Sequence, residues 1–104
     1  MRTEIISRQH ELLVRRLVLE PGEATPWHTD PFRRFSVVVR GERLRIEFRD
    51  GEEPIIVAAH PGLAGWDAPD HRIHRAINDG GAAYEEVVLF FVSSEKADPQ
   101  PDAR

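Results

Sequence analysis

Residues 43–49, RLRIEFR, alternate strictly between charged and apolar side chains. In an extended segment, Leu44, Ile46 and Phe48 would lie on one face, and the arginine and glutamate residues between them on the other. This period of two residues is typical of a β-strand that buries one face and exposes the other to water. The stretch therefore predicts a half-buried strand with an apolar inner face.

The same character extends along the chain in both directions. Further stretches rich in Val, Ile, Leu and Phe end at Gly, Pro, Asp or Asn turn signals. About eight short strands without a 3.6-residue period indicate an all-β sandwich or barrel. An Asp-Gly pair at 50–51 favours a hairpin between two of these strands. Besides 43–49, strands are predicted at residues 11–20, 34–40, 54–59, 63–69, 71–78 and 83–93.

The chain has 104 residues, which suffices for one domain and leaves too little for two cores. We expect one barrel domain over residues 1–93. A loose tail is expected over 94–104, where two prolines stand among few apolar residues. The chain has no cysteine, which excludes disulfides, thiolate metal sites and cysteine nucleophiles.

Charge and hydropathy narrow the classes of partner. Fourteen basic and 18 acidic residues give a net charge of −4, whereas nucleic acids and anionic membranes select basic surfaces. No apolar run approaches the roughly 20 residues of a membrane span. The first ten residues lack the apolar core of a signal peptide, so the cytoplasm is the predicted compartment.

Two segments contain most of the side chains that can carry chemistry. The first starts with GEATPWHTD and contributes Gly22, His28, Asp30, Arg34 and Gly41. The second, PDHRIHRAIN, contributes Pro69, His71, His74 and Asn78. Imidazole and carboxylate groups are common ligands of divalent metals. Residues two apart on a strand point the same way, so His28 and Asp30 can face one cavity.

Together the two segments resemble the paired motifs of the cupin superfamily. The resemblance extends over residues 18–91 and rests on matches at Gly22, His28, Gly41, Pro69, His74 and Asn78. It implies a double-stranded β-helix, also called a jelly-roll barrel, that holds a small molecule in its cavity. In the family, three histidines and a glutamate hold a divalent metal at the barrel mouth.

The departures from the family pattern affect the metal. Asp30 stands where the family has its second histidine, and Arg34 where it has the glutamate. Carried over residue by residue, His28, Asp30 and His74 remain as a three-ligand set suited to iron, zinc, manganese or nickel. In the other interpretation no metal binds, because the Arg34 guanidinium repels a dication and can pair with Asp30 instead.

The sequence allows two interpretations for several of these residues. Asp30 can be a ligand or can begin a turn before proline. His28 can face the cavity or lie half-buried in a loop. Arg34, His71 and Trp66 are the candidate ligand-binding residues. Arg34 can be an anion clamp or a solvated residue at a strand end, and His71 an exposed turn residue or a further ligand. Trp66 is expected as core or cavity wall rather than as a specific ligand platform.

Three functional hypotheses follow, and the residues do not choose between enzyme and binding protein. The chain holds a metal that activates a small acidic substrate clamped by Arg34, or it binds an anion without metal, or it is an assembly or regulatory domain. If Arg34 faces the cavity, Phe35, Val37 and Val39 face outward, and the last strand adds an apolar aromatic residue. Exposed apolar patches of this kind mark interfaces, so a homodimer is expected.

Overall fold

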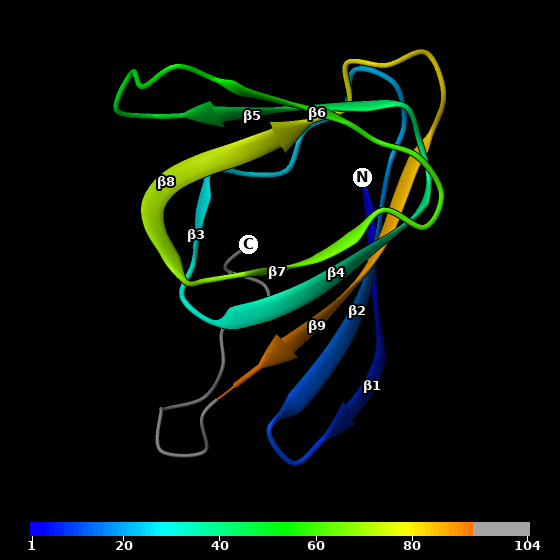
Figure 1. Cartoon of the computed structure of the whole chain (residues 1–104), viewed down its shortest axis with the longest axis vertical. Coiled ribbons are helices and arrows are strands. Elements are labelled where there is room, and N and C mark those ends of the chain that lie inside the picture. The colour runs from blue at the N-terminus through cyan, green and yellow to red at the C-terminus, as the bar shows by residue number, and fades with distance from the viewer. Residues whose placement is uncertain (93–104) are drawn as a thin grey trace.

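The computed structural model describes residues 1–92, so the predicted tail at 94–104 and the predicted domain end at residue 93 lie outside the described residues. Residues 1–92 form nine strands and no helix (Figure 1), which confirms the all-β prediction. No helix in this part of the chain is long and apolar enough to cross a membrane. The strands are β1 (Arg2–Gln9), β2 (Leu12–Leu19), β3 (His28–Asp30), β4 (Arg33–Arg40), β5 (Arg43–Phe48), β6 (Ile55–Ala58), β7 (Ala64–Asp67), β8 (Asp70–Ile77) and β9 (Tyr84–Phe91).

The strands form two antiparallel sheets that face each other. The five-stranded sheet has the order β1-β2-β9-β4-β7, and the four-stranded sheet has the order β3-β8-β5-β6. Consecutive strands β4 and β5 lie in different sheets, as do β6 and β7, so the chain passes repeatedly between the two layers. Figure 1 shows the layers with the β1–β2 hairpin extending beyond the barrel. This is the predicted double-stranded β-helix, or jelly roll.

Strand β5 has the faces that its sequence predicts. Leu44 and Phe48 are 6% and 7% exposed, and Ile46 lines the space between the sheets. On the other face, Arg45 Nε donates to Glu47 Oε2 at 3.0 Å. The predicted hairpin to β6 is also present, and the positive φ of 89° at its turn residue requires the glycine found there, Gly51.

Strand β1 was not predicted from the sequence, and β3 was expected only from the motif that contains His28 and Asp30. All eight residues of β1 are exposed, and it pairs only with β2 at the edge of its sheet. Its side chains carry no pattern of burial, because neither face of the strand packs against the barrel. Strand β3 has three residues, too few to establish a period of two.

The buried apolar side chains form two clusters. The first joins β5 of one sheet to β2, β4 and β9 of the other, which ties the two layers together; it contains Leu17, Leu19, Val38, Leu44, Ala59 and Tyr84. The second contains Leu13, Val88, Phe90 and Val92. The polar cavity residues described below lie between the sheets beside these clusters.

Two of the motif residues have structural roles. Asn78 is fully buried, its Nδ2 donates to the carbonyls of Leu19 and Ala82 at 2.9 Å each, and its Oδ1 accepts from Gly80 N at 3.0 Å. Gly41 has a φ of 141°, and a Cβ there would lie 2.6 Å from Tyr84 Cδ1. These residues therefore fix the turns around the barrel and are not among the residues that line the cavity described below.

Replacing Asn78 with alanine should lower the free energy of unfolding by about 2–4 kcal/mol, because the buried carbonyl of Leu19 and two partly buried hydrogen-bonding groups of the following turn lose their partner. Chemical denaturation measures this loss. Asp79→Ala is the matched control, since its side chain makes only a partly exposed ion pair with Arg43 and should cost less than about 1 kcal/mol. Equal stabilities for the two variants would contradict a structural role for Asn78.

Candidate metal and ligand site

The two sheets enclose a cavity of about 500 Å³. Its wall is mostly apolar, with contributions from Leu17, Val38, Leu44, Ile46 and Phe48. Polar side chains are concentrated in two places, one on each sheet. A mostly apolar cavity with a few converging polar groups is the usual form of a small-molecule site.

The first polar group is made by His28, Asp30 and His74. Strand β3 pairs with β8 so that His28 lies directly opposite His74, and Asp30 follows two residues later on the same face. His74 Nε2 lies 2.7 Å from Asp30 Oδ2, and His28 Nε2 lies 3.7 Å from the same oxygen. The three side chains are buried, with exposed fractions of 9%, 4% and 6% in chain order.

The two imidazole rings are held in the same way. His28 Nδ1 lies 2.7 Å from the carbonyl of Pro26, and His74 Nδ1 lies 2.7 Å from the carbonyl of Arg72. A carbonyl oxygen can only accept, so each Nδ1 carries a proton and each Nε2 points toward Asp30. A backbone carbonyl on the other ring nitrogen is the usual support of a metal-binding histidine.

The donor set fits a divalent metal. One ligand atom from each of the three residues lies within 4.8 Å of the others. Ligand atoms on one dication lie roughly 3.0–3.5 Å apart. The two distances from the histidine Nε2 atoms to Asp30 Oδ2, 2.7 and 3.7 Å, lie on either side of this range. Small side-chain shifts would therefore suffice. Two histidines and one carboxylate also leave coordination positions for a ligand.

Without a metal, His74 and Asp30 form a hydrogen-bonded pair. The carboxylate accepts from Nε2 and thereby raises the pKa of His74 above its ordinary value of 6.5, while burial opposes this shift. The carbonyl of Arg72, which accepts from Nδ1, raises this pKa further. Protonated His74 then donates from both ring nitrogens, and a metal must displace the Nε2 proton.

Arg34 enters the cavity from β4 on the opposite sheet. Its Nη2 lies 3.4 Å from Asp30 Oδ2 and 3.9 Å from Asp67 Oδ2. Its Nη1 is buried and has no hydrogen-bond partner among the described residues. The guanidinium therefore lies against the metal-ligand candidates, with one nitrogen enclosed and without a hydrogen-bond acceptor among the described residues.

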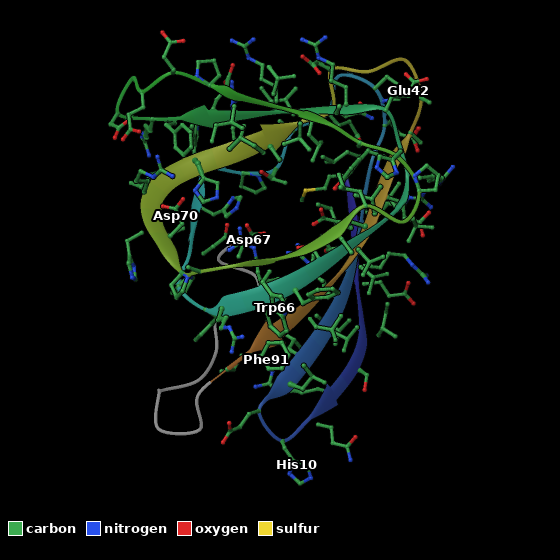
Figure 2. The ribbon with its side chains drawn as sticks, viewed as in Figure 1. His10, Glu42, Trp66, Asp67, Asp70 and Phe91 are labelled. Carbon is green, nitrogen blue, oxygen red and sulfur yellow. The ribbon has the colours of Figure 1, made fainter. Side chains whose placement is uncertain are left out.

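The structure does not bring His71 to this site, and it turns the Trp66 ring away. His71 is exposed and does not line the cavity, because it lies an odd number of residues from His74 and so on the other face of β8. Trp66 forms part of the cavity wall, but its ring packs on the outer face, 5.0 Å from Phe35 and 5.3 Å from Phe91. Figure 2 shows Trp66 and Phe91 together on that side of the sheet.

Asp70 lies beside the site and was not predicted from the sequence. It pairs with Asp30 across β3 and β8, which would suit a further metal ligand. However, Arg72 Nη2 donates to Asp70 Oδ2 at 2.8 Å, and this contact lowers the pKa of Asp70 to about 2. Its carboxylate is therefore already occupied by a guanidinium. Figure 2 shows Asp67 and Asp70 near the inner sides of the two sheets.

A second polar group in the cavity was also not predicted from the sequence. It consists of Arg15 on β2 with Tyr84 and Glu86 on β9, all lining the cavity. The sequence offers two adjacent arginines on β2, and only the strand register reveals that Arg15 faces inward and Arg16 outward. Arg15 is 5% exposed, whereas the side chain of Arg16 is 43% exposed.

Comparison with solved structures identifies the architecture. A cupin domain from Bordetella pertussis Tohama I superposes with a TM-score of 0.77 at 17% sequence identity, over 88% of this chain and 93% of that chain. This chain has the cupin fold. An RmlC-like cupin family protein with a double-stranded β-helix fold, from Methanocaldococcus jannaschii, matches this chain with a TM-score of 0.70 at 18% identity, over 88% of this chain and 79% of that chain.

An oxalate oxidase in complex with the substrate analogue glycolate matches this chain with a TM-score of 0.60 at 21% identity, over 79% of this chain and 42% of that chain. Neither the models of known protein families nor the sequences of curated proteins match the chain. The likeness therefore establishes the fold, and the function has to be argued from the cavity itself.

Proposed function

We propose that this cupin binds a small carboxylic acid in its barrel cavity at a divalent metal, iron, zinc, manganese or nickel, held by His28, Asp30 and His74. The observation that carries the proposal is the convergence of two histidine Nε2 atoms on one buried carboxylate, with both Nδ1 atoms fixed by backbone carbonyls. When bound, the metal would act as a Lewis acid on an oxygen of the acid.

Arg34 binds and orients the carboxylate of this acid. Its guanidinium offers a planar pair of donors that matches carboxylate geometry, and its Nη1 has no protein partner in the described part of the chain. The apolar wall excludes water from the rest of the ligand. A cupin-fold oxalate oxidase was solved with the carboxylate glycolate, which supports small acids as ligands of this kind of cavity.

A metal-free binding protein is the second candidate. The 3.4 Å approach of Arg34 to Asp30 favours it, since this ion pair occupies a carboxylate that a metal would need. Protonated His74 and Arg34 would then hold the anion directly. Titration of hexanoate, a simple aliphatic carboxylate, against metal-stripped and manganese-loaded protein distinguishes the two candidates. If the metal binds the acid, hexanoate should bind at least tenfold more tightly to the manganese-loaded protein. If the protein binds anions without metal, the two affinities should be equal.

Metal affinity should depend on pH through His74. Because the folded pKa of His74 lies above 6.5, the metal competes with a proton even near neutral pH. The apparent affinity should fall about tenfold per pH unit below this pKa. Zinc titrations by calorimetry in buffers of different ionisation enthalpy should detect protons released as the metal binds. A metal affinity that does not change with pH in the acidic range would contradict ligation by His74.

We also propose that the functional unit is a homodimer that pairs through the outer face of the five-stranded sheet. Trp66 and Phe91 are 54% and 38% exposed there, and Phe35 and Val37 lie beside them half-buried. Two copies related by a twofold axis would each cover this apolar patch with the same patch of the other.

Light scattering should therefore give about twice the chain mass of 11.9 kDa at micromolar concentration. Trp66→Lys should shift the protein to the monomer, because a charge in the covered patch is costly. Ile73→Lys, on the other sheet and also exposed, is the control and should stay dimeric. A wild-type protein of 11.9 kDa under these conditions would contradict the dimer.

A further inference from the structure

A charged group without a role in the proposed metal site lies on the other wall of the cavity. Tyr84 Oη donates to Glu86 Oε1 at 2.6 Å, and Arg15 Nη2 lies 3.8 Å from Glu86 Oε2. Arg15 and Tyr84 are 5% and 3% exposed, and the side chain of Glu86 is 15% exposed. All three line the cavity that also contains Arg34.

This placement is costly for stability alone. A buried ion pair loses most of its hydration, and well-packed apolar residues at the same positions are often as stabilising or more so. Neighbouring inward positions on the same two strands are apolar, among them Leu13, Leu17 and Val88. The fold therefore does not require charges here, and a ligand that uses them would explain their presence.

The strand register relates this group to Arg34. Val88 on β9 pairs with Arg15 of β2 on one side and with Ser36 of β4 on the other, so Arg15 is level with a residue two positions beyond Arg34. Two strand spacings of about 4.8 Å and a two-residue step of about 6.8 Å separate the Cα atoms of the two arginines by about 12 Å. A ligand whose carboxylate is held by the long side chain of Arg34 can therefore extend across the inner face of the sheet until its far end meets Arg15 and Glu86.

The chemistry of the pair selects the far end of the ligand. Arg15 only donates hydrogen bonds and the Glu86 carboxylate only accepts them, so together they suit a group that does both. The 3.8 Å between their closest atoms exceeds hydrogen-bond length, which leaves a hydroxyl able to bridge them. A second carboxylate would be repelled by Glu86, and a methyl group would leave the pair without the contact.

We infer that Arg15 and Glu86 form a specificity site for the hydroxyl group of a small aliphatic hydroxy acid. This inference rests on the proposed function, because it takes the carboxylate of that acid to be held at Arg34. Tyr84 is a positioning residue, since its hydroxyl fixes one oxygen of Glu86 and leaves the other toward Arg15.

Three six-carbon acids test the inference on manganese-loaded protein by calorimetry: hexanoate, 6-hydroxyhexanoate and adipate. The wild-type protein should bind 6-hydroxyhexanoate about tenfold more tightly than hexanoate, which corresponds to about one charge-assisted hydrogen bond. Adipate should bind more weakly than 6-hydroxyhexanoate. This comparison uses the unaltered chain and does not depend on whether a variant folds.

Glu86→Gln should change the order of the ligands. Without the negative charge, Arg15 can take the second carboxylate of adipate, so adipate should gain about tenfold while 6-hydroxyhexanoate loses affinity. Glu85→Gln is the matched control: it changes the neighbouring residue on the outer face of β9, where Arg40 Nε contacts Glu85 Oε1 at 2.9 Å, and should leave the order unchanged.

The outcomes separate this inference from the proposed function. If none of the three acids binds to the wild-type protein, both fail. If all three bind within twofold of one another, or if Glu86→Gln does not alter their order, only the hydroxyl site fails. Arg34→Gln should weaken all three acids alike, because it removes the contact that they share.

Discussion

Replacing Asp30 with asparagine should lower metal affinity by at least about 100-fold. The carboxylate contributes one of three ligand atoms and the only negative charge among them. Loss of residues that merely support metal ligands already costs 10- to 100-fold in affinity, so loss of a charged ligand should cost more. Asparagine keeps the size of the side chain, which limits the change to charge and donor type. Calorimetric titration of zinc or manganese measures the effect.

Asp67→Asn is the matched control for this experiment. Asp67 also lies near Arg34, with 3.9 Å between their closest charged atoms, but its side chain is 56% exposed and it is not part of the ligand group. Its replacement should change metal affinity by less than about threefold, since an exposed charge is well screened. Similar losses of metal affinity in the two variants would mean that any negative charge near the cavity attracts the metal, which contradicts a site built on Asp30.

Replacing Arg34 with glutamate should raise metal affinity by about 10- to 100-fold. The substitution removes a cation next to the ligand atoms and supplies a carboxylate in its place. It also frees Asp30, whose Oδ2 lies 3.4 Å from Arg34 Nη2 in the present arrangement. Repulsion between a guanidinium and a dication a few ångströms apart amounts to several kcal/mol at the dielectric of a partly buried site.

Arg34→Gln separates the two contributions. It removes the cation without adding a ligand, so metal affinity should rise less than in Arg34→Glu, while both variants should lose affinity for hexanoate. If Arg34→Glu binds metal no better than the wild-type protein, Arg34 does not oppose the metal. If neither protein binds any of the four metals, His28 and His74 are ligand-contacting or structural residues.

The fold was predictable because its strands carry local patterns. The alternation over 43–49 and the Asp-Gly turn after it depend on neighbours in sequence, and the structure has both the strand and the hairpin. The three-residue group was also accessible. His28 and Asp30 are two apart, so they share a face of a strand, and the motif spacing placed His74 with them.

The remaining features depend on pairing between distant strands. Only the β2–β9 register reveals that Arg15 faces inward while the adjacent Arg16 faces outward. Trp66 was predicted as core or cavity wall; it does border the cavity, and only its pairing with Phe35 reveals that the ring lies on the outer face. Strand β1 has no burial pattern from which it could be found. These outcomes are set by tertiary contacts rather than by local sequence.

The metal content of protein purified without an affinity tag tests the central proposal most directly. The protein is incubated with excess iron, zinc, manganese or nickel, and unbound ions are removed. Elemental analysis by inductively coupled plasma mass spectrometry should then find about one divalent ion per chain for at least one metal. The Asp30→Asn protein, treated in the same way, should hold much less. A wild-type protein that retains none of the four metals would contradict a metal site at His28, Asp30 and His74.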